Sequence, residues 1–234
     1  MPAAGTVRHD AGFALAWALL LTAYNNVFGR HRWHRRGYLP LNACAAGAAL
    51  AAATASGLTP ADLGLGRGRW WPGRAGCAMA AAVGTGWLLI AAIPATRPLL
   101  DDKRISGLDG RAVAYQALVR IPVGTVLWEE IAFRGVLQAA LRRVMPQPAA
   151  VAVASVTFGI WHVRPTAEAL RANGLAGDRR RAVAGVTAGV AATAAGGVLF
   201  SCLRARSGSL IAPVLLHVAT NCGGAAAAWL AASW

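Results

Sequence analysis

Charge is scarce in this sequence, and one sign of it is especially rare. Asp and Glu number nine against 23 Lys and Arg, so charged residues make up 14% of the 234. A soluble domain normally has about a quarter. The four cysteines show no CxxC or other ligand spacing. The sequence therefore excludes a soluble domain with a charged outer face, and it argues against a disulfide framework or a zinc knuckle.

Long apolar runs take the place of the missing charge. Hydrophobic residues make up 56% of the chain. Many of them form nearly uncharged runs of about 20 residues, which as helices fit the roughly 30 Å hydrocarbon core of a bilayer. In lipid such runs must be helical, because exposed strand edges would leave backbone groups unpaired. The sequence predicts an all-α, polytopic transmembrane bundle of about seven apolar helices, with loops between them that include the stretch 164–182. The expected helices lie roughly at 11–28, 39–57, 75–94, 113–141, 149–163, 182–203 and 209–232.

The net charge of +14 comes from arginines in the short loops between these runs. Loop arginines that face anionic lipid explain this charge, so a nucleic-acid partner is not expected. The chain is expected to be an integral multi-pass membrane protein whose partners are membrane lipid and a substrate. The GxxxG spacing of Gly185 and Gly189 is interpreted as close packing within one bundle.

Ionisable side chains inside the apolar runs carry the functional information, because each is costly in a bilayer. They are few, and they come from three separate helices. The set consists of Arg120, Glu129, Glu130, Arg134, His162 and His217. Carboxylate and imidazole groups that converge on one cavity could activate water and carry protons.

The spacing of the acidic pair predicts its local contacts. Glu130 and Arg134 are four residues apart, so they share a helix face and can form an ion pair that lowers the cost of burying both. Glu129 is rotated by about 100° from Glu130. The two carboxylates can therefore have different roles, and the residues alone do not decide which one is the base.

Two further pairs show the same four-residue spacing, namely Phe158 with His162 and His217 with Asn221. Asn221 then points the same way as His217, and its amide could donate to a developing oxyanion. Each feature alone also has a structural interpretation, because buried ion pairs, packed histidines and interfacial asparagines all occur without catalysis. All of them together, in order on successive helices, favour a site.

Three motifs carry a resemblance to a known family. They are Glu129-Glu130-Ile-Ala-Phe-Arg134, Phe158-Gly-Ile-Trp-His162 and His217-Val-Ala-Thr-Asn221. Together they resemble the CPBP family, which comprises the CAAX prenyl proteases and bacteriocin-processing enzymes and is also called the Abi family. The resemblance implies a catalytic helical core over residues 113–234, preceded by variable N-terminal transmembrane helices over 1–112.

What the resemblance implies is an intramembrane endopeptidase. Glu129 would be the base that activates water, and His162 would hold that water. His217 and Asn221 would stabilise the tetrahedral oxyanion. The residues in supporting roles would be Glu130, Arg134 and Phe158.

The cofactor stays open at this point. Glu129, His162 and His217 are the candidate ligands for one divalent metal, since two His and one Glu can form a catalytic zinc site with an open position. The spacing is not HExxH, however, and a glutamate-dependent mechanism without a metal explains the same residues equally well.

Two other classes of function compete with the protease. Buried Glu, His and Arg also build the relays of ion-coupled or proton-coupled transporters, although no inverted repeat supports one here. A non-catalytic immunity or scaffold protein could keep the same fold. The expected location is a bacterial plasma membrane. Orientation stays open, because loop charges place the N-terminus outside and the resemblance implies the reverse; the substrate sequence and the oligomeric state stay open too.

Overall fold

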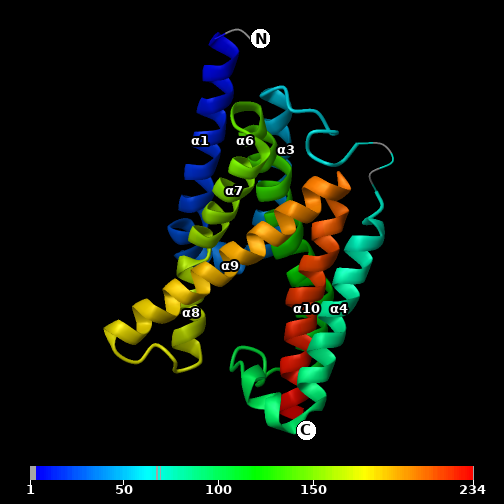
Figure 1. Ribbon diagram of the computed structural model, residues 1–234. Coiled ribbons are helices and arrows are strands. Elements are labelled where there is room, and N and C mark those ends of the chain that lie inside the picture. The colour runs from blue at the N-terminus through cyan, green and yellow to red at the C-terminus, as the bar shows by residue number, and fades with distance from the viewer. Residues whose placement is uncertain (1–3, 67, 69, 234) are drawn as a thin grey trace.

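The computed structural model describes residues 4–66, 68 and 70–233. Residues 1–3, 67 and 69 of the expected N-terminal part and residue 234 of the expected core lie outside these ranges. Every regular element of the described chain is a helix, which confirms the all-α fold (Figure 1). In chain order they are α1 (Ala4–Asn26), η1 (Phe28–Arg30), α2 (Arg32–Arg36), α3 (Tyr38–Ala55), α4 (Gly73–Ala92), η2 (Pro94–Leu100), α5 (Gly110–Tyr115), η3 (Gln116–Leu127), η4 (Glu130–Leu137), α6 (Gln138–Val144), α7 (Gln147–Trp161), α8 (Val163–Ala172), α9 (Arg179–Ser207) and α10 (Ile211–Ser233).

All seven expected apolar segments coincide with helices. Within the described ranges, 5 helical segments are long and apolar enough to cross a membrane, and they comprise Arg8–Arg30, Tyr38–Ala55, Gly73–Ala92, Arg179–Ser207 and Ile211–Ser233. The other two expected segments are the run 110–144, in which the helix type changes, and the 15-residue α7. Large apolar side chains such as Leu15, Leu88 and Leu118 remain exposed. Outward-facing apolar surface of this extent suits lipid, so the chain is an integral membrane protein.

The sequence predicts a loop over 164–182, and that prediction is wrong at both ends: α8 covers its first half, α9 begins at Arg179, and only 173–178 connects the two helices. Helix α8 continues almost directly from α7 and ends at Ala172. Pro165 lies in its first turn, where a missing N–H does no harm. The helix stops where Gly174 takes a positive φ of 70°.

Helix α8 also explains the GxxxG face of α9. A Cβ added at Gly185 would collide with Leu170, and one added at Gly189 would collide with Thr166. Both partners lie on α8, so these glycines permit close packing within the bundle, as the sequence predicted.

The helices form two flanks joined by an oblique one. In Figure 1, α4 and α10 lie side by side, whereas α1, α3, α6 and α7 gather on the other flank and α9 crosses between them. Side chains fix the ends of α9, since Asp178 accepts from the backbone N–H of Arg181 at 2.9 Å and Gly208 ends the helix with φ 66°.

The N-terminal helices hold the central run 110–144 in place. Trp17 of α1 donates its indole N–H to the carbonyl of Ala132 at 3.0 Å, and Asn42 of α3 donates to the carbonyl of Gly124 at 2.7 Å. The carbonyl of Gly124 belongs to η3 and that of Ala132 to η4. Both elements are π-helical, with i→i+5 hydrogen bonds instead of the usual i→i+4. The division of the chain at 112/113 stays a prediction, and the two sides of that boundary share one core.

Candidate active site

The two adjacent glutamates lie at the junction between η3 and η4, deep inside the bundle. Glu129 is 5% exposed and Glu130 is fully buried. They point to different partners, as the rotation of about 100° between neighbouring helical residues requires. The structure therefore separates the two carboxylates.

Glu130 binds structural partners through one oxygen, and its other oxygen, Oε2, is buried without a hydrogen-bond partner among the described residues. Its Oε1 accepts from Arg134 Nη1 at 3.1 Å and from His217 Nδ1 at 2.8 Å. The expected ion pair with Arg134 is present, and both side chains are buried. The Arg134 guanidinium also lies over the ring of Phe158, 4.0 Å from its centre. This cation–π contact offsets part of the cost of burying the charge, and it gives Phe158 a definite role in the site.

One carboxylate oxygen of Glu129 is hydrogen-bonded, and the other has no partner within the described chain, so we call it the open oxygen. Trp161 donates its indole N–H to Oε1 at 3.0 Å. The other oxygen, Oε2, is buried and has no hydrogen-bond partner among the described residues. It lies 4.0 Å from His162 Nε2 and 3.9 Å from His217 Nε2. These distances are too long for direct hydrogen bonds and suit a small bridging group.

The orientation of His162 follows from its place at a bend. Helix α7 ends at Trp161, and His162 is the residue between α7 and α8. Its Nδ1 lies 2.8 Å from the carbonyl oxygen of Phe158. A carbonyl can only accept, so Nδ1 carries the proton and a neutral ring presents the lone pair of Nε2 towards Glu129.

His217 and Asn221 lie on α10 and contact each other. His217 Nδ1 faces the Glu130 carboxylate, so this nitrogen donates. Its Nε2 lies 3.1 Å from Asn221 Nδ2, and in the neutral ring it accepts from that amide. Phe200 of α9 stacks on the imidazole with ring centres 4.9 Å apart. The expected pairing of His217 with Asn221 on one face is confirmed.

A cavity of about 1180 Å³ leads to these groups. Glu129, His162 and Asn221 line it, together with residues of η3, α8 and the segment 99–105. His217 does not line the cavity and lies behind it, in contact with Asn221. Three of the four residues predicted to be catalytic therefore line one cavity, and His217 does not.

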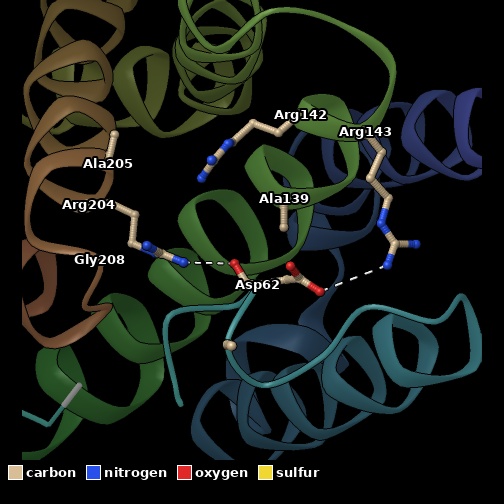
Figure 2. A pocket seen from close by; sticks show the side chains of 8 residues that line it. Asp62, Ala139, Arg142, Arg143, Arg204, Ala205 and Gly208 are labelled. Atoms are coloured by element: carbon tan, nitrogen blue, oxygen red, sulfur yellow. Dashed lines mark hydrogen bonds and ion pairs between the residues drawn. The ribbon is translucent and has the colours of Figure 1, made fainter. Parts of the chain in front are cut away.

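A second, smaller hollow of about 430 Å³ lies near the ends of α6 and α9 (Figure 2). Arg142, Arg143 and Arg204 surround Asp62 there, and none of the predicted site residues lines it. Arg204 Nη2 donates to the Asp62 carbonyl at 2.7 Å, and Arg143 Nη2 lies 3.9 Å from its carboxylate. These contacts fix the loop after α3.

Two aromatic residues of the site were not singled out from the sequence. Trp161 holds Glu129, and Phe200 stacks on His217. Trp161 had a usable signal, because it stands next to His162 inside the second motif. Phe200 had none, since it is an apolar residue in an apolar helix and its role depends on how α9 crosses α10.

The arrangement does not fit the candidate metal site. In the described ranges, no group of three His, Cys, Asp or Glu is placed to hold a metal ion. The Nε2 lone pair of His217, which a metal would need, faces the Asn221 amide. His162 and Glu129 alone would supply two ligands, fewer than the three of a catalytic zinc site.

A scan against protein families decides the affiliation of this region. Residues 112–223 match the family model described as type II CAAX prenyl endopeptidase Rce1-like. The chain carries an Rce1-like domain. The resemblance to the CPBP family is thereby confirmed, and the family is one of proteases. Comparisons with curated proteins and with solved structures gave no match.

The Rce1-like domain contains every predicted site residue. It begins in α5 and ends in α10, so Glu129, His162 and Asn221 all fall within it. The helices α1, α3 and α4 precede it and pack against it. The family supports intramembrane endopeptidase activity in general terms.

Proposed function

We propose that this chain is an intramembrane endopeptidase in which Glu129 is the general base. The observation that carries the proposal is the open oxygen of Glu129. Oε2 is buried, lacks a partner within the described chain, and lies about equally far from two imidazole nitrogens beside the cavity. A water between Oε2 and His162 Nε2 would donate one hydrogen to each, because both atoms are acceptors. Its own lone pair would then be free to attack.

The proposed reaction needs only groups of the protein. Glu129 takes a proton as the water oxygen bonds to the peptide carbonyl carbon, and the carbonyl oxygen becomes an oxyanion. Asn221 donates its remaining N–H to that oxyanion, and His217 supports this donor by accepting the other N–H of the same amide. Glu129 then returns the proton to the amide nitrogen as the C–N bond breaks. The products are a carboxylic acid and an amine.

Glu130 and Arg134 have a positioning role in this proposal. Their ion pair and the bond to His217 fix the ring that orients Asn221. Phe158 supports Arg134 through its ring and His162 through its carbonyl. The substrate is a peptide or protein that reaches the site from the membrane. The Ala-, Gly- and Arg-rich composition fits a GC-rich bacterium, and its plasma membrane is the proposed location.

The test is peptide cleavage by purified protein in lipid nanodiscs. Glu129→Gln should abolish cleavage with the fold intact, since the amide keeps the shape but accepts no proton. Glu168→Gln is the matched control, because Glu168 lines the same cavity and is paired with Arg164 at 2.6 Å. Full activity in Glu129→Gln would move the base to Glu130 or to a metal. If the wild type cleaved no peptide but carried a pH-dependent flux, the protease proposal would fail.

A further inference from the structure

The central run 110–144 holds a second arginine, Arg120, which the proposed reaction does not use. Arg120 is partly buried and lines the same cavity as Glu129. Its Nη1 donates to Gln116 Oε1 at 3.2 Å, and its guanidinium carbon lies 4.3 Å from the ring centre of Tyr38. Neither contact supplies a negative charge, and most of the five N–H donors of the guanidinium stay available.

The other arginines of the cavity differ from Arg120. Arg104 is paired with Asp102 at 2.6 Å, and Arg164 is paired with Glu168 at 2.6 Å. Arg171 is exposed. In the part of the chain that the structure describes, Arg120 has no carboxylate partner, although it lies inside an apolar run where an unpaired cation is costly. An anion that enters the cavity would offset this cost.

The unusual winding of η3 brings Arg120 and Glu129 to one side. They are nine residues apart, and at 100° per residue an α-helix would place them on opposite faces. The i→i+5 bonds of η3 turn the chain less per residue, and both side chains line one cavity. Along the axis they are separated by at most about 13.5 Å, at a rise of about 1.5 Å per residue.

This separation matches a short piece of peptide. An extended chain covers about 3.3–3.6 Å per residue, so three residues reach about 10 Å from the bond at Glu129 and the arginine side chain covers the rest. The anion that every protein carries at a fixed distance from its last peptide bonds is the C-terminal carboxylate. The CAAX sequence named in the family description is a C-terminal motif of four residues.

We propose that Arg120 binds the C-terminal carboxylate of the substrate, about three residues beyond the scissile bond. Arg120 would then determine specificity, because it restricts cleavage to the ends of proteins. A guanidinium suits this task, since its two-pronged donor geometry matches a carboxylate. The assignment rests on the proposed endopeptidase function.

The kinetic test compares one fluorescent peptide in two forms. The peptide ends in S-farnesyl-Cys-Val-Leu-Ala, with a free carboxylate or with a C-terminal amide. The wild type in phosphatidylcholine nanodiscs should cleave the acid with a kcat/KM about 10- to 100-fold higher, as expected for a charge-assisted hydrogen-bonded pair. Arg120→Gln should remove this preference by slowing the acid alone. Arg111→Gln is the control, because Arg111 is an exposed arginine of the same helical run that does not line the cavity.

A binding arm keeps the two proposals separable. In the Glu129→Gln background, where the peptide stays intact, the acid should bind about 10- to 100-fold more tightly than the amide, and Arg120→Gln should equalise them. If the wild type cleaves nothing, the endopeptidase proposal fails and this binding ratio still decides the role of Arg120. Equal handling of acid and amide by the wild type would overturn the assignment. So would an Arg120-dependent retention of phosphatidylglycerol over phosphatidylcholine with no acid preference, which would make Arg120 a lipid contact.

Discussion

Glu130 Oε1 lies 2.8 Å from His217 Nδ1 and joins two helices whose residues are 87 positions apart in the chain. The same oxygen accepts a hydrogen bond from Arg134 at 3.1 Å, so this one atom accepts two hydrogen bonds, from Arg134 and from His217. Glu130 is therefore committed to holding the site together. Glu129, its neighbour, lines the cavity and has an oxygen without a partner there, whereas Glu130, whose Oε2 also lacks a partner among the described residues, does not line it. On this ground we propose Glu129 rather than Glu130 as the base.

The first prediction concerns the removal of Arg134. Arg134→Ala leaves Glu130 buried without its cationic partner, so stability should fall by about 3–5 kcal/mol, as for other buried ion pairs that lose one member. Thermal unfolding in detergent measures the change. Arg142→Ala is the control, because Arg142 is an exposed arginine further along the same run and its loss should change stability by less than about 0.5 kcal/mol. Equal stability of both variants would show that the buried pair contributes nothing.

The second prediction concerns the indole that holds Glu129. Trp161→Phe keeps an aromatic ring but removes the N–H that Glu129 Oε1 accepts at 3.0 Å. Cleavage should fall about 10-fold or more, since a hydrogen bond to a charged group contributes about 1.5–3 kcal/mol. Trp128→Phe is a matched control, because Trp128 is a buried tryptophan whose Nε1 has no partner among the described residues. A similar loss of cleavage in both variants would assign the effect to packing.

Much of the fold follows from the sequence because membrane helices have a strong signal. Apolar length alone located all seven segments, and the four-residue spacings placed Glu130 with Arg134 and His217 with Asn221. Helix α8 was missed for a physical reason. It is short and carries three charged residues, and a proline at its start resembles a loop signal although it is harmless in a first turn.

The three-dimensional parts of the site were beyond the sequence. The π-helical winding of η3 changes which residues share a face, and local residue propensities do not predict such winding. That winding decides whether Arg120 and Glu129 reach the same cavity. The position of His217 behind Asn221 likewise depends on the packing of α10 against Phe200, which residue spacing does not encode.

The third prediction tests the close approach of α7 and α9. A Cβ on Gly159 would lie 2.8 Å from the carbonyl oxygen of Val190 and 3.0 Å from Ala194 Cβ. Because a backbone atom must move, Gly159→Ala should destabilise the fold by about 1–3 kcal/mol, the usual cost of overpacking. Gly196→Ala on α9 meets nothing within 4 Å and should be neutral or slightly stabilising. Thermal unfolding compares the two, and an unchanged Gly159→Ala would contradict the contact.

The fourth prediction concerns pH and the loop between α4 and α5. Arg104 donates to the Asp102 carboxylate and holds the pKa of that group below its usual value of 3.8. Because the pKa of Asp102 is lower in the folded state, its ion pair stabilises the fold fully above the usual pKa. This stabilisation is lost as the pH falls from that value through the lower pKa of the folded state. Asp102 also accepts from Asn173 of the segment after α8, at 3.3 Å. The loop should therefore loosen from this segment in acid.

A dye on Lys103, the single lysine of the chain, measures this loosening. Its anisotropy should be constant above about pH 5 and should decrease as Asp102 becomes protonated at lower pH. Asp102→Asn cannot titrate, so its anisotropy should not vary over the same range. An identical pH profile in this variant would show that another group controls the loop.

The last prediction separates a catalytic role of Asn221 from structural support. If Asn221 donates to the oxyanion, its N–H matters mainly in the transition state. Asn221→Ala should then lower kcat by about 10²–10³-fold and leave KM nearly unchanged, as for other sole oxyanion donors. Asn221→Asp keeps the shape but replaces donors by a negative charge, so its loss should be at least as large. Thr220→Ala is the control, because the Thr220 hydroxyl bonds only the carbonyl of Leu216 at 2.9 Å and does not line the cavity. A lower thermal stability with an unchanged kcat in Asn221→Ala would instead make Asn221 a residue that only holds His217.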